Sequence, residues 1–404
     1  MSDNLHFVPF SDTVICRYGD HRSLPVHDRL DPRLLHGEIH LTLEAVSPVM
    51  IAGGKRRWEN GASVALFATD AQNRFRIPGS SLRGLIRQNM QILGLGAICA
   101  GRNEDIPDGY KNYVAGDREP RYGLPGSHQT GLLDYPRSVM GFVMKLETRP
   151  KKFETVCYRS RISVGELTAV GTPVELPAVL LDQSLPRQSD PGFIEELGGK
   201  RFRLKGFRQY PPFQPPTSSA TASLGFRPLA AGTRFTGTIR YRNLHPDELG
   251  LLLWCLRLEE GCVQTMGMGK AAGYGQMALT IDKLVEYSTK TLYSSLTSTG
   301  TPAADTAGRI EGLIQAYRNF TARPDRAGQD PAELDTIKKF LSLRKGLTAP
   351  TPVRQAEDIP KPAPTPAQPS NKELRRQAKQ AAPQATQEQK DDWRKQFGER
   401  FQKN

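Results

Sequence analysis

The sequence predicts an α+β fold, and three stretches carry that prediction. Residues 38–45 alternate between polar and apolar side chains, which indicates a strand buried on one face. Residues 77–93 place apolar side chains three and four positions apart, which indicates an amphipathic helix. A second helix, begun by a proline at 246, precedes a strand at 276–285. With strands at 138–170 and 235–241 between them, the order is βαββαβ, that of a ferredoxin-like, RRM-like fold.

A basic segment follows the first strand. After a Gly-Gly pair, three cations and an aromatic residue stand in a row: Lys55, Arg56, Arg57 and Trp58. Cations suit phosphate contacts and an indole suits base stacking. We therefore expect an exposed loop that binds nucleic acid. The alternative is a loop whose Trp58 packs back on the protein.

The first predicted helix begins after a Pro-Gly turn, where the hydroxyl of Ser80 or Ser81 can cap it. Arg83 stands in its first turn, and Arg87 lies one turn further along the same side. Gly84 leaves room for a ligand or another backbone. Free N–H groups, hydroxyls and guanidinium groups together suit a phosphate. A surface helix with solvated arginines would have the same pattern.

Two segments, 95–137 and 183–224, are predicted to be insertions into this domain because they are rich in turn-forming residues. The second contains KRFRLKGFRQYPPF, in which Lys205 and Arg208 alternate with aromatic residues. Interleaved cations and aromatic rings are typical of proteins that bind single-stranded nucleic acid. A basic β-hairpin is equally compatible with this segment.

A glycine loop follows the second helix. It contains Lys270 and four glycines: Gly267, Gly269, Gly273 and Gly275. Glycine permits positive φ and a close backbone approach, which a bound RNA strand or a neighbouring subunit would need. The loop follows a helix and precedes a strand, the reverse of the order in a dinucleotide-binding motif, and it lacks the GK[ST] of a P-loop.

Composition narrows the class of protein. The chain has 404 residues and a net charge of +13, which favours a polyanionic partner such as nucleic acid. Its five cysteines show no C-x-x-C spacing, so neither a disulfide framework nor a zinc site is predicted. Neither a signal peptide nor an apolar run of the roughly 18 residues that span a membrane is recognised. We expect a cytoplasmic protein without a membrane partner.

Four parts are predicted along the chain. An N-terminal arm at 1–36 precedes the ferredoxin-like domain at 37–287. A linker and helical extension follow at 288–347, with a helix begun by Asp305 or Thr306. Residues 348–404 form a Pro/Ala-rich linker and a basic tail, which we expect to be disordered.

Two motifs give a family resemblance. IPGSSLRGLIR at 77–87 resembles the IPGSSLKG-x-x-R signature of RAMP proteins, the ferredoxin-like subunits of CRISPR systems, and MGMGKAAGYGQMAL at 266–279 resembles their C-terminal glycine-rich loop. Residues 235–256 and 205–212 are similar to further segments of family members. The resemblance implies a backbone-type subunit of a type III antiviral effector complex, which binds guide RNA (crRNA), target RNA and other subunits.

By this resemblance, Ser80, Ser81, Arg83 and Arg87 would hold guide phosphates, and the segment 55–58 would face RNA. Some type III backbone subunits also cut target RNA with an aspartate in that loop and a metal ion. Glu59 is the only acid in the corresponding residues 53–68. It is therefore the candidate catalytic residue, with Mg²⁺ as its candidate cofactor. Without the aspartate we expect binding rather than cleavage, and binding that requires no metal.

Two further readings stay open. A single-stranded RNA-binding module outside CRISPR systems fits the charge but leaves the two end motifs unexplained. A guide-processing endoribonuclease would need a general base such as histidine, and the seven histidines show no paired arrangement.

Overall fold

The computed structural model describes residues 5–11, 13–59, 61–97, 133–149, 152–181, 194–198, 201–215, 224–294 and 300–346. All of these belong to one compact unit of the chain, Met1–Val353. The tail predicted at 348–404 lies outside the described residues, and so do parts of both predicted insertions. None of the described helices is long and apolar enough to cross a membrane.

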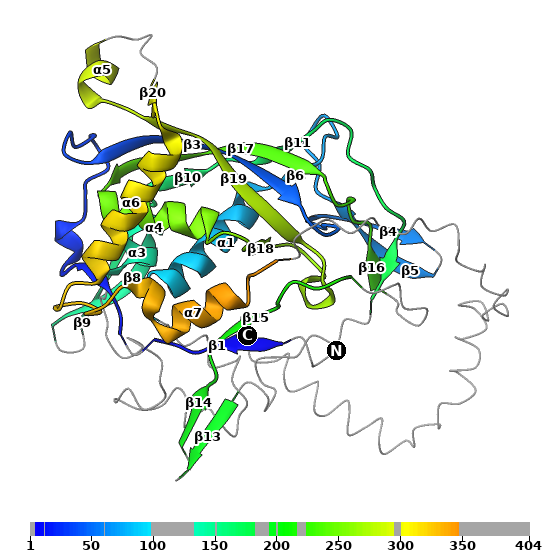
Figure 1. Ribbon diagram of the computed structural model, residues 1–404, viewed down its shortest axis with the longest axis horizontal. Helices are drawn as coiled ribbons and strands as arrows, with labels where there is room; N and C mark the ends of the chain where they lie inside the picture. The colour runs from blue at the N-terminus through cyan, green and yellow to red at the C-terminus, as the bar shows by residue number, and fades with distance from the viewer. Residues whose placement is uncertain are drawn as a thin grey trace, which may run out of the picture. The chain divides into compact units, whose positions relative to one another are not determined.

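The fold is a mixed α+β arrangement built on one large antiparallel sheet (Figure 1). Its strand order is β18-β19-β3-β17-β11-β6, while β10 also pairs with β17 and β20 with β19. The strands are β3 (Leu35–Ala45), β6 (Arg76–Ile77), β10 (Ile162–Val164), β11 (Leu167–Val170), β17 (Arg234–Leu244), β18 (Gln264–Thr265), β19 (Gln276–Glu286) and β20 (Thr301–Pro302).

Strand β3 lies at the centre of this sheet, between β17 and β19. Leu41 stands opposite Gly237 on one side and Ile281 on the other. The alternation predicted for residues 38–45 is confirmed, because Ile39, Leu43 and the other apolar side chains there are buried while the polar ones are half-buried.

The described helices are α1 (Gly79–Leu93), α3 (Tyr135–Met140), α4 (Pro246–Arg257), α5 (Thr289–Ser294), α6 (Thr306–Thr321) and α7 (Asp335–Ser342), with 3-10 turns at His21–Ser23, Lys270–Ala272 and Pro331–Glu333. Helices α1, α4 and α6 pack on one face of the large sheet, α3 and α7 pack against α1, and α5 projects away from the sheet (Figure 1). Asp305 caps α6 by accepting a hydrogen bond from the backbone N–H of Gly308, as predicted. Helix α6 lies against α4 at Gly250, where a Cβ atom would stand only 2.0 Å from the Leu313 carbonyl oxygen.

A smaller sheet has the order β12-β16-β5-β4, in which β16 and β5 are parallel. Its strands are β4 (Ala52–Glu59), β5 (Ala62–Phe67), β12 (Val179–Leu180) and β16 (Leu224–Phe226). Four further pairs are two-stranded: β1 (His6–Val8) with β15 (Phe207–Gln209), β2 (Cys16–Tyr18) with β7 (Leu133–Asp134), β8 (Phe142–Arg149) with β9 (Lys152–Tyr158), and β13 (Ile194–Gly198) with β14 (Arg201–Leu204).

The prediction of a loop at the basic segment was wrong, because this segment is strand β4. Gly54 adopts a φ of +82°. The pairing of β4 with β5 is irregular between Ala52 and Arg56, around this glycine, and the strand continues after it. Strand β4 is exposed on both faces, so its sequence carries none of the alternation that marks a half-buried strand.

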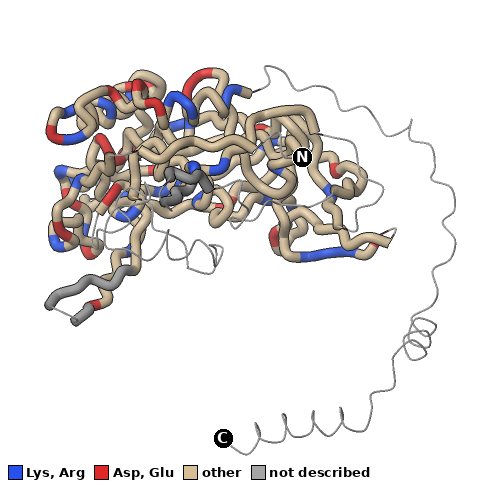
Figure 2. The backbone as a smooth tube through the Cα atoms, turned by 90° about the horizontal axis from the view of Figure 1, so that it is seen from below, with Lys and Arg blue, Asp and Glu red and all other residues tan. Residues whose placement is uncertain are grey.

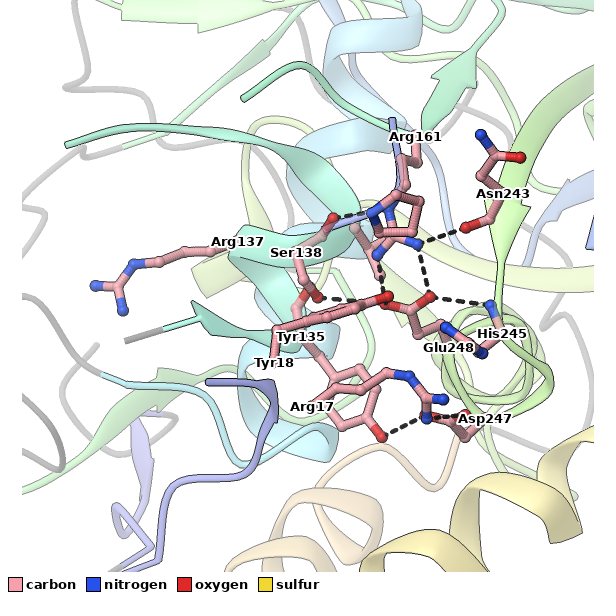
Figure 3. A network of polar contacts seen from close by, with 12 residues as sticks. Arg17, Tyr18, Tyr135, Arg137, Ser138, Arg161, Asn243, His245, Asp247 and Glu248 are labelled. Carbon is pink, nitrogen blue, oxygen red and sulfur yellow. Dashed lines mark hydrogen bonds and ion pairs between the residues drawn. The ribbon is translucent and has the colours of Figure 1, made fainter. Parts of the chain in front are cut away.

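A buried polar network ties the N-terminal arm to the core (Figure 3). The side chains of Arg161 and Glu248 are both 0% exposed and form a two-pronged ion pair. The Tyr18 hydroxyl donates to the same carboxylate at 3.1 Å. Burial alone would raise the pKa of Glu248, but the Arg161 guanidinium holds it below its ordinary value.

The neighbouring acid at the start of α4 binds the arm a second time. Arg17 lies 2.5 Å from an oxygen of Asp247, and the Tyr135 hydroxyl donates to the other oxygen at 2.8 Å (Figure 3). Strand β2 of the arm is therefore fixed to α4 through two acids, although the arm and the helix are some 230 positions apart in the chain.

Candidate nucleic-acid interface

Strand β4 presents the predicted cations and aromatic ring to solvent. All its residues from Ala52 to Trp58 are exposed, and Trp58 is 73% exposed. Trp58 does not pack back on the protein, so that alternative was wrong. Figure 2 shows Lys and Arg as an unbroken basic length of backbone on the side of the molecule that carries the smaller sheet.

The hairpin of β4 and β5 is held in shape by contacts across its strands. Val64 and Phe67 of β5 are buried, which anchors one strand in the core. Arg56 donates from Nε to the Ser63 Oγ atom at 2.7 Å and from a terminal nitrogen to the Ser63 carbonyl oxygen at 2.8 Å. The Arg56 guanidinium is thus held against strand β5 of the hairpin.

Glu59 lies at the end of β4, where Arg227 occupies its carboxylate. The Arg227 guanidinium donates to both carboxylate oxygens, with a shortest distance of 2.7 Å. Arg57 lies 3.7 Å away. The hydrogen bond from Arg227 holds the pKa of Glu59 below its ordinary value, so the carboxylate is ionised and paired.

The described residues near Glu59 do not fit a magnesium site. Magnesium requires several oxygen ligands, usually with more than one carboxylate or a phosphate among them. No group of three or more acidic, histidine or cysteine side chains that could hold a metal occurs among the described residues. A catalytic role for Glu59 stays a prediction.

The glycine loop packs against the chain that leads into β4. The Met268 N–H donates to the Met50 carbonyl oxygen at 2.8 Å, and the Gly275 N–H donates to the Pro48 carbonyl oxygen at 2.9 Å. Gly267 and the other three glycines of the loop all have positive φ. A Cβ atom at Gly275 would stand 1.9 Å from the Met266 carbonyl oxygen. The close approach predicted for these glycines is therefore made to the chain itself.

Lys270 is turned into this loop rather than outward. Its Nζ atom donates to the Gly267 carbonyl oxygen at 2.8 Å. Burial lowers the pKa of Lys270, and the positive charges of Arg344 and Arg208 lower it further. Direct contact of Lys270 with RNA stays a prediction.

Lys205 and Arg208 come to the same region through β15, which pairs with β1 of the N-terminal arm. Lys205 is exposed, with its Nζ atom 5.9 Å from the centre of the Phe7 ring, and Arg208 is half-buried. The chain continues to Phe213, whose carbonyl oxygen accepts a hydrogen bond from Gln276 at 2.7 Å. The structure thus brings the segment 205–215, the glycine loop and the base of the β4–β5 hairpin together.

Helix α1 has the predicted apolar face, and Leu82, Ile86 and Met90 are buried in it. The predicted serine cap was wrong. Pro78 is the N-cap residue and no side chain caps the helix, because the helix already begins at Gly79 and places both serines inside its first turn.

The polar side of α1 divides into bound and exposed residues. Ser80 and Arg87 are exposed, and Ser81 is half-buried. The Arg83 guanidinium donates to the Ser160 Oγ atom at 3.0 Å and to the Met140 carbonyl oxygen at 2.6 Å. Arg83 therefore faces the end of α3 and the start of β10, whereas the glycine loop contacts other elements.

The outer face of the large sheet carries several ion pairs. Its charges are neutralised across strands, for example by the ion pairs of Arg234 with Glu44 and of Arg240 with Glu38, both at 2.8 Å. RRM sheets instead stack bases on exposed aromatic rings. The exposed basic surface of β4 is the stronger candidate.

The family is decided by comparison with known protein families. The RAMP superfamily model matches residues 42–278, which is more than half of the chain. The chain belongs to the RAMP superfamily. The match runs from β3 to the start of β19 and includes the β4–β5 hairpin, α1 and the whole glycine loop. Membership indicates a CRISPR-associated, RNA-binding protein. No curated protein matches this chain.

Proposed function

We propose that this RAMP protein is a guide-RNA (crRNA)-binding structural subunit of a type III CRISPR effector complex that acts in antiviral defence in the cytoplasm. The exposed basic and aromatic strand β4, in a chain of this family, carries the proposal. Its partners would be crRNA, target RNA and other subunits of the complex.

We further propose that residues 37–287 form a ferredoxin-like domain. The strand order β19-β3-β17-β11 in the large sheet supports this proposal, as does the position of a helix after β3 and after β17 in the chain. That order places the first and third of these four strands along the chain, β3 and β17, at the centre, as a βαββαβ domain with antiparallel pairing does.

In this proposal the backbone of RNA follows β4, where Lys55 and Arg57 would contact phosphates and Trp58 would stack on a base. The glycine loop would support the surface from behind by holding residues 48–51 in place. Such binding requires no cofactor. The Arg227 contact with Glu59 supports a structural role for this acid.

Affinity purification of the tagged protein from a host that carries its complex tests this proposal. The RNA that copurifies should have ends derived from the CRISPR repeat, and sequencing identifies them. A purified complex without RNA, or with RNA of random origin, contradicts the guide-RNA role.

A further inference from the structure

A pocket of about 620 Å³ opens beside β10 and β17, and five arginines line it. They are Arg83, Arg159, Arg161, Arg240 and Arg242. No acidic side chain is among the described lining residues. The volume lies within the range of about 300 to 1,000 Å³ that is typical of sites for small ligands.

Two of the five arginines are neutralised by acids that do not line the pocket. Arg161 pairs with the buried Glu248, and Arg240 pairs with Glu38 at 2.8 Å. For the other three, no carboxylate of the described residues lies within 4.0 Å. The pocket therefore has an excess of positive charge.

Neutral groups hold two of these three side chains in position. Arg83 donates to the Ser160 hydroxyl and the Met140 carbonyl oxygen, and a terminal nitrogen of Arg242 lies 3.1 Å from the His27 Nδ1 atom. Burial lowers the pKa of His27, which keeps this ring a neutral acceptor. Burial and the nearby Arg87 also lower the pKa of Arg83. The arginines are thus fixed without being neutralised.

Part of the remaining wall of the pocket is apolar, beside the polar residues His36, Ser160 and Ser163. It includes Leu30, Val164 and Leu292, together with the rings of Tyr241 and Tyr287. Arginine binds phosphate through two parallel hydrogen bonds, and aromatic or aliphatic side chains pack against the face of a base. The arginines of the pocket therefore suit the phosphate of a nucleotide, and its apolar and aromatic residues suit the base.

We infer that this pocket binds one nucleotide, with its phosphate on Arg159 and Arg242 and its base against the apolar wall. The nucleotide is either a unit of a bound RNA strand or a free mononucleotide, since both offer the same phosphate and base. For a bound RNA strand, the inference deepens the proposed function and rests on it, because the pocket would be a second site of RNA contact besides β4.

Binding measurements with the full chain test the pocket. The variant carries Arg159→Ala and Arg242→Ala, and the single Arg159→Ala variant keeps the contact of Arg242 with His27. Arg234→Ala is the matched control, because Arg234 lies on the same strand as Arg242, is exposed and does not line this pocket. The probes are a fluorescent single-stranded RNA oligonucleotide and AMP.

We expect the double variant to bind RNA about tenfold more weakly or worse, and the control to bind as wild type does. The slope of log affinity against log salt should fall by about 0.7 for each lost phosphate contact. If AMP affinity falls and RNA affinity does not, the pocket's ligand is the free nucleotide. Unchanged affinity for both probes overturns the inference.

A hairpin variant separates this inference from the proposed function. Arg57→Ala combined with Trp58→Ala alters β4 alone. Weaker RNA binding by this variant, with normal binding of both probes by the arginine variant, overturns the pocket and leaves the proposed function standing. RNA binding that neither variant weakens contradicts both.

Discussion

At the scale of single residues, burial separates two glutamates that both pair with arginine. Glu248 and Arg161 are fully buried, whereas Glu44 and Arg234 have side chains 39% and 62% exposed. Removal of one partner from a buried pair leaves an uncompensated charge, which is far more costly than the loss of a solvated pair.

Glu248→Gln should therefore lower the free energy of unfolding by about 3 to 5 kcal/mol. Glu44→Gln, the matched control on the sheet surface, should lower it by no more than about 1 kcal/mol. Urea unfolding followed by circular dichroism measures both. Equal losses in the two variants would show that burial of the Arg161 pair has no special effect.

The pH dependence of this loss has a defined sign. The pKa of Glu248 in the folded protein lies below its ordinary value of 4.5. Its ionised form therefore stabilises the fold fully above that value, and the contribution disappears as the pH falls through the folded pKa. The difference between wild type and Glu248→Gln should shrink below about pH 4.5.

Substitution of Glu59 tests the hypothesis that this protein cuts target RNA. Because Arg227 occupies its carboxylate, we expect no cutting of guide-matched target RNA by the wild-type complex or by Glu59→Gln with magnesium present. Gel analysis of end-labelled target RNA measures this. Cutting by wild type that Glu59→Gln abolishes would establish the catalytic role, and cutting that persists would exclude Glu59.

At this scale, contacts between residues far apart in the chain could not be predicted from the sequence. Exposure of the segment 55–58 could be predicted, because consecutive cations are rarely buried. The pairing of Arg161 with Glu248 could not, because 87 positions separate them and no local pattern records such a contact. The bonds of Arg83 to Ser160 and Met140 depend on the packing of α3 and β10 in the same way.

At the scale of elements, the exposed ring on β4 offers a direct test. Trp58→Ala should weaken binding of single-stranded RNA about tenfold, because stacking on an aromatic side chain contributes about 1 to 3 kcal/mol per base. Tyr293→Ala is the matched control, since Tyr293 on α5 is 72% exposed and Trp58 is 73% exposed. Fluorescence anisotropy measures both, and equal effects would contradict a role for β4.

Two glycines should respond in opposite directions to substitution by alanine. Gly275 has a φ of +77° and no room for a methyl group, so Gly275→Ala should destabilise the protein by at least about 2 kcal/mol. Gly84 is exposed in α1, with nothing within 4 Å of an added Cβ atom among the described residues. Gly84→Ala should stabilise it by about 1 kcal/mol.

Urea unfolding measures the free energy of unfolding of the Gly275→Ala and Gly84→Ala variants. A stable Gly275→Ala variant would show that the loop's contact with the Met266 carbonyl oxygen is dispensable.

Elements with one buried face could be predicted, and others could not. Strand β3 and helix α1 have 11 and 15 residues, and the apolar period within each is long enough to distinguish a strand from a helix. Strand β7 has 2 residues and α3 has 6, too few to show a period. The insertion predicted at 95–137 was wrong at its C-terminal end, because β7 and the start of α3 fall inside it and are buried in the core, Tyr135 included.

At the scale of the whole molecule, the two ends of the described chain are part of the core. The N-terminal arm is bound to α4 through Arg17 and Tyr18. The Tyr317 hydroxyl of α6 donates to the Leu93 carbonyl oxygen of α1 at 2.5 Å. Arg326 also donates to the Cys16 carbonyl oxygen, so the helical extension contacts the arm itself.

This arrangement of sheets and helices determines which charged side chains are exposed. The helix face of the large sheet is covered by α1, α4 and α6, and its outer face carries paired charges, whereas Lys55, Arg56 and Arg57 stand exposed in a row on β4. Composition predicted a polyanionic partner and the residues 55–58 predicted the contact segment, and the fold places that segment on an exposed strand.

The affinity of the purified full chain for single-stranded RNA, measured as a function of salt, tests this account most directly. We predict that log affinity falls linearly with log salt, with a slope of about −0.7 for each phosphate contacted, and that Trp58→Ala and Arg57→Ala weaken it. Absence of RNA binding, or an affinity that does not change between about 50 and 200 mM salt, would contradict the account.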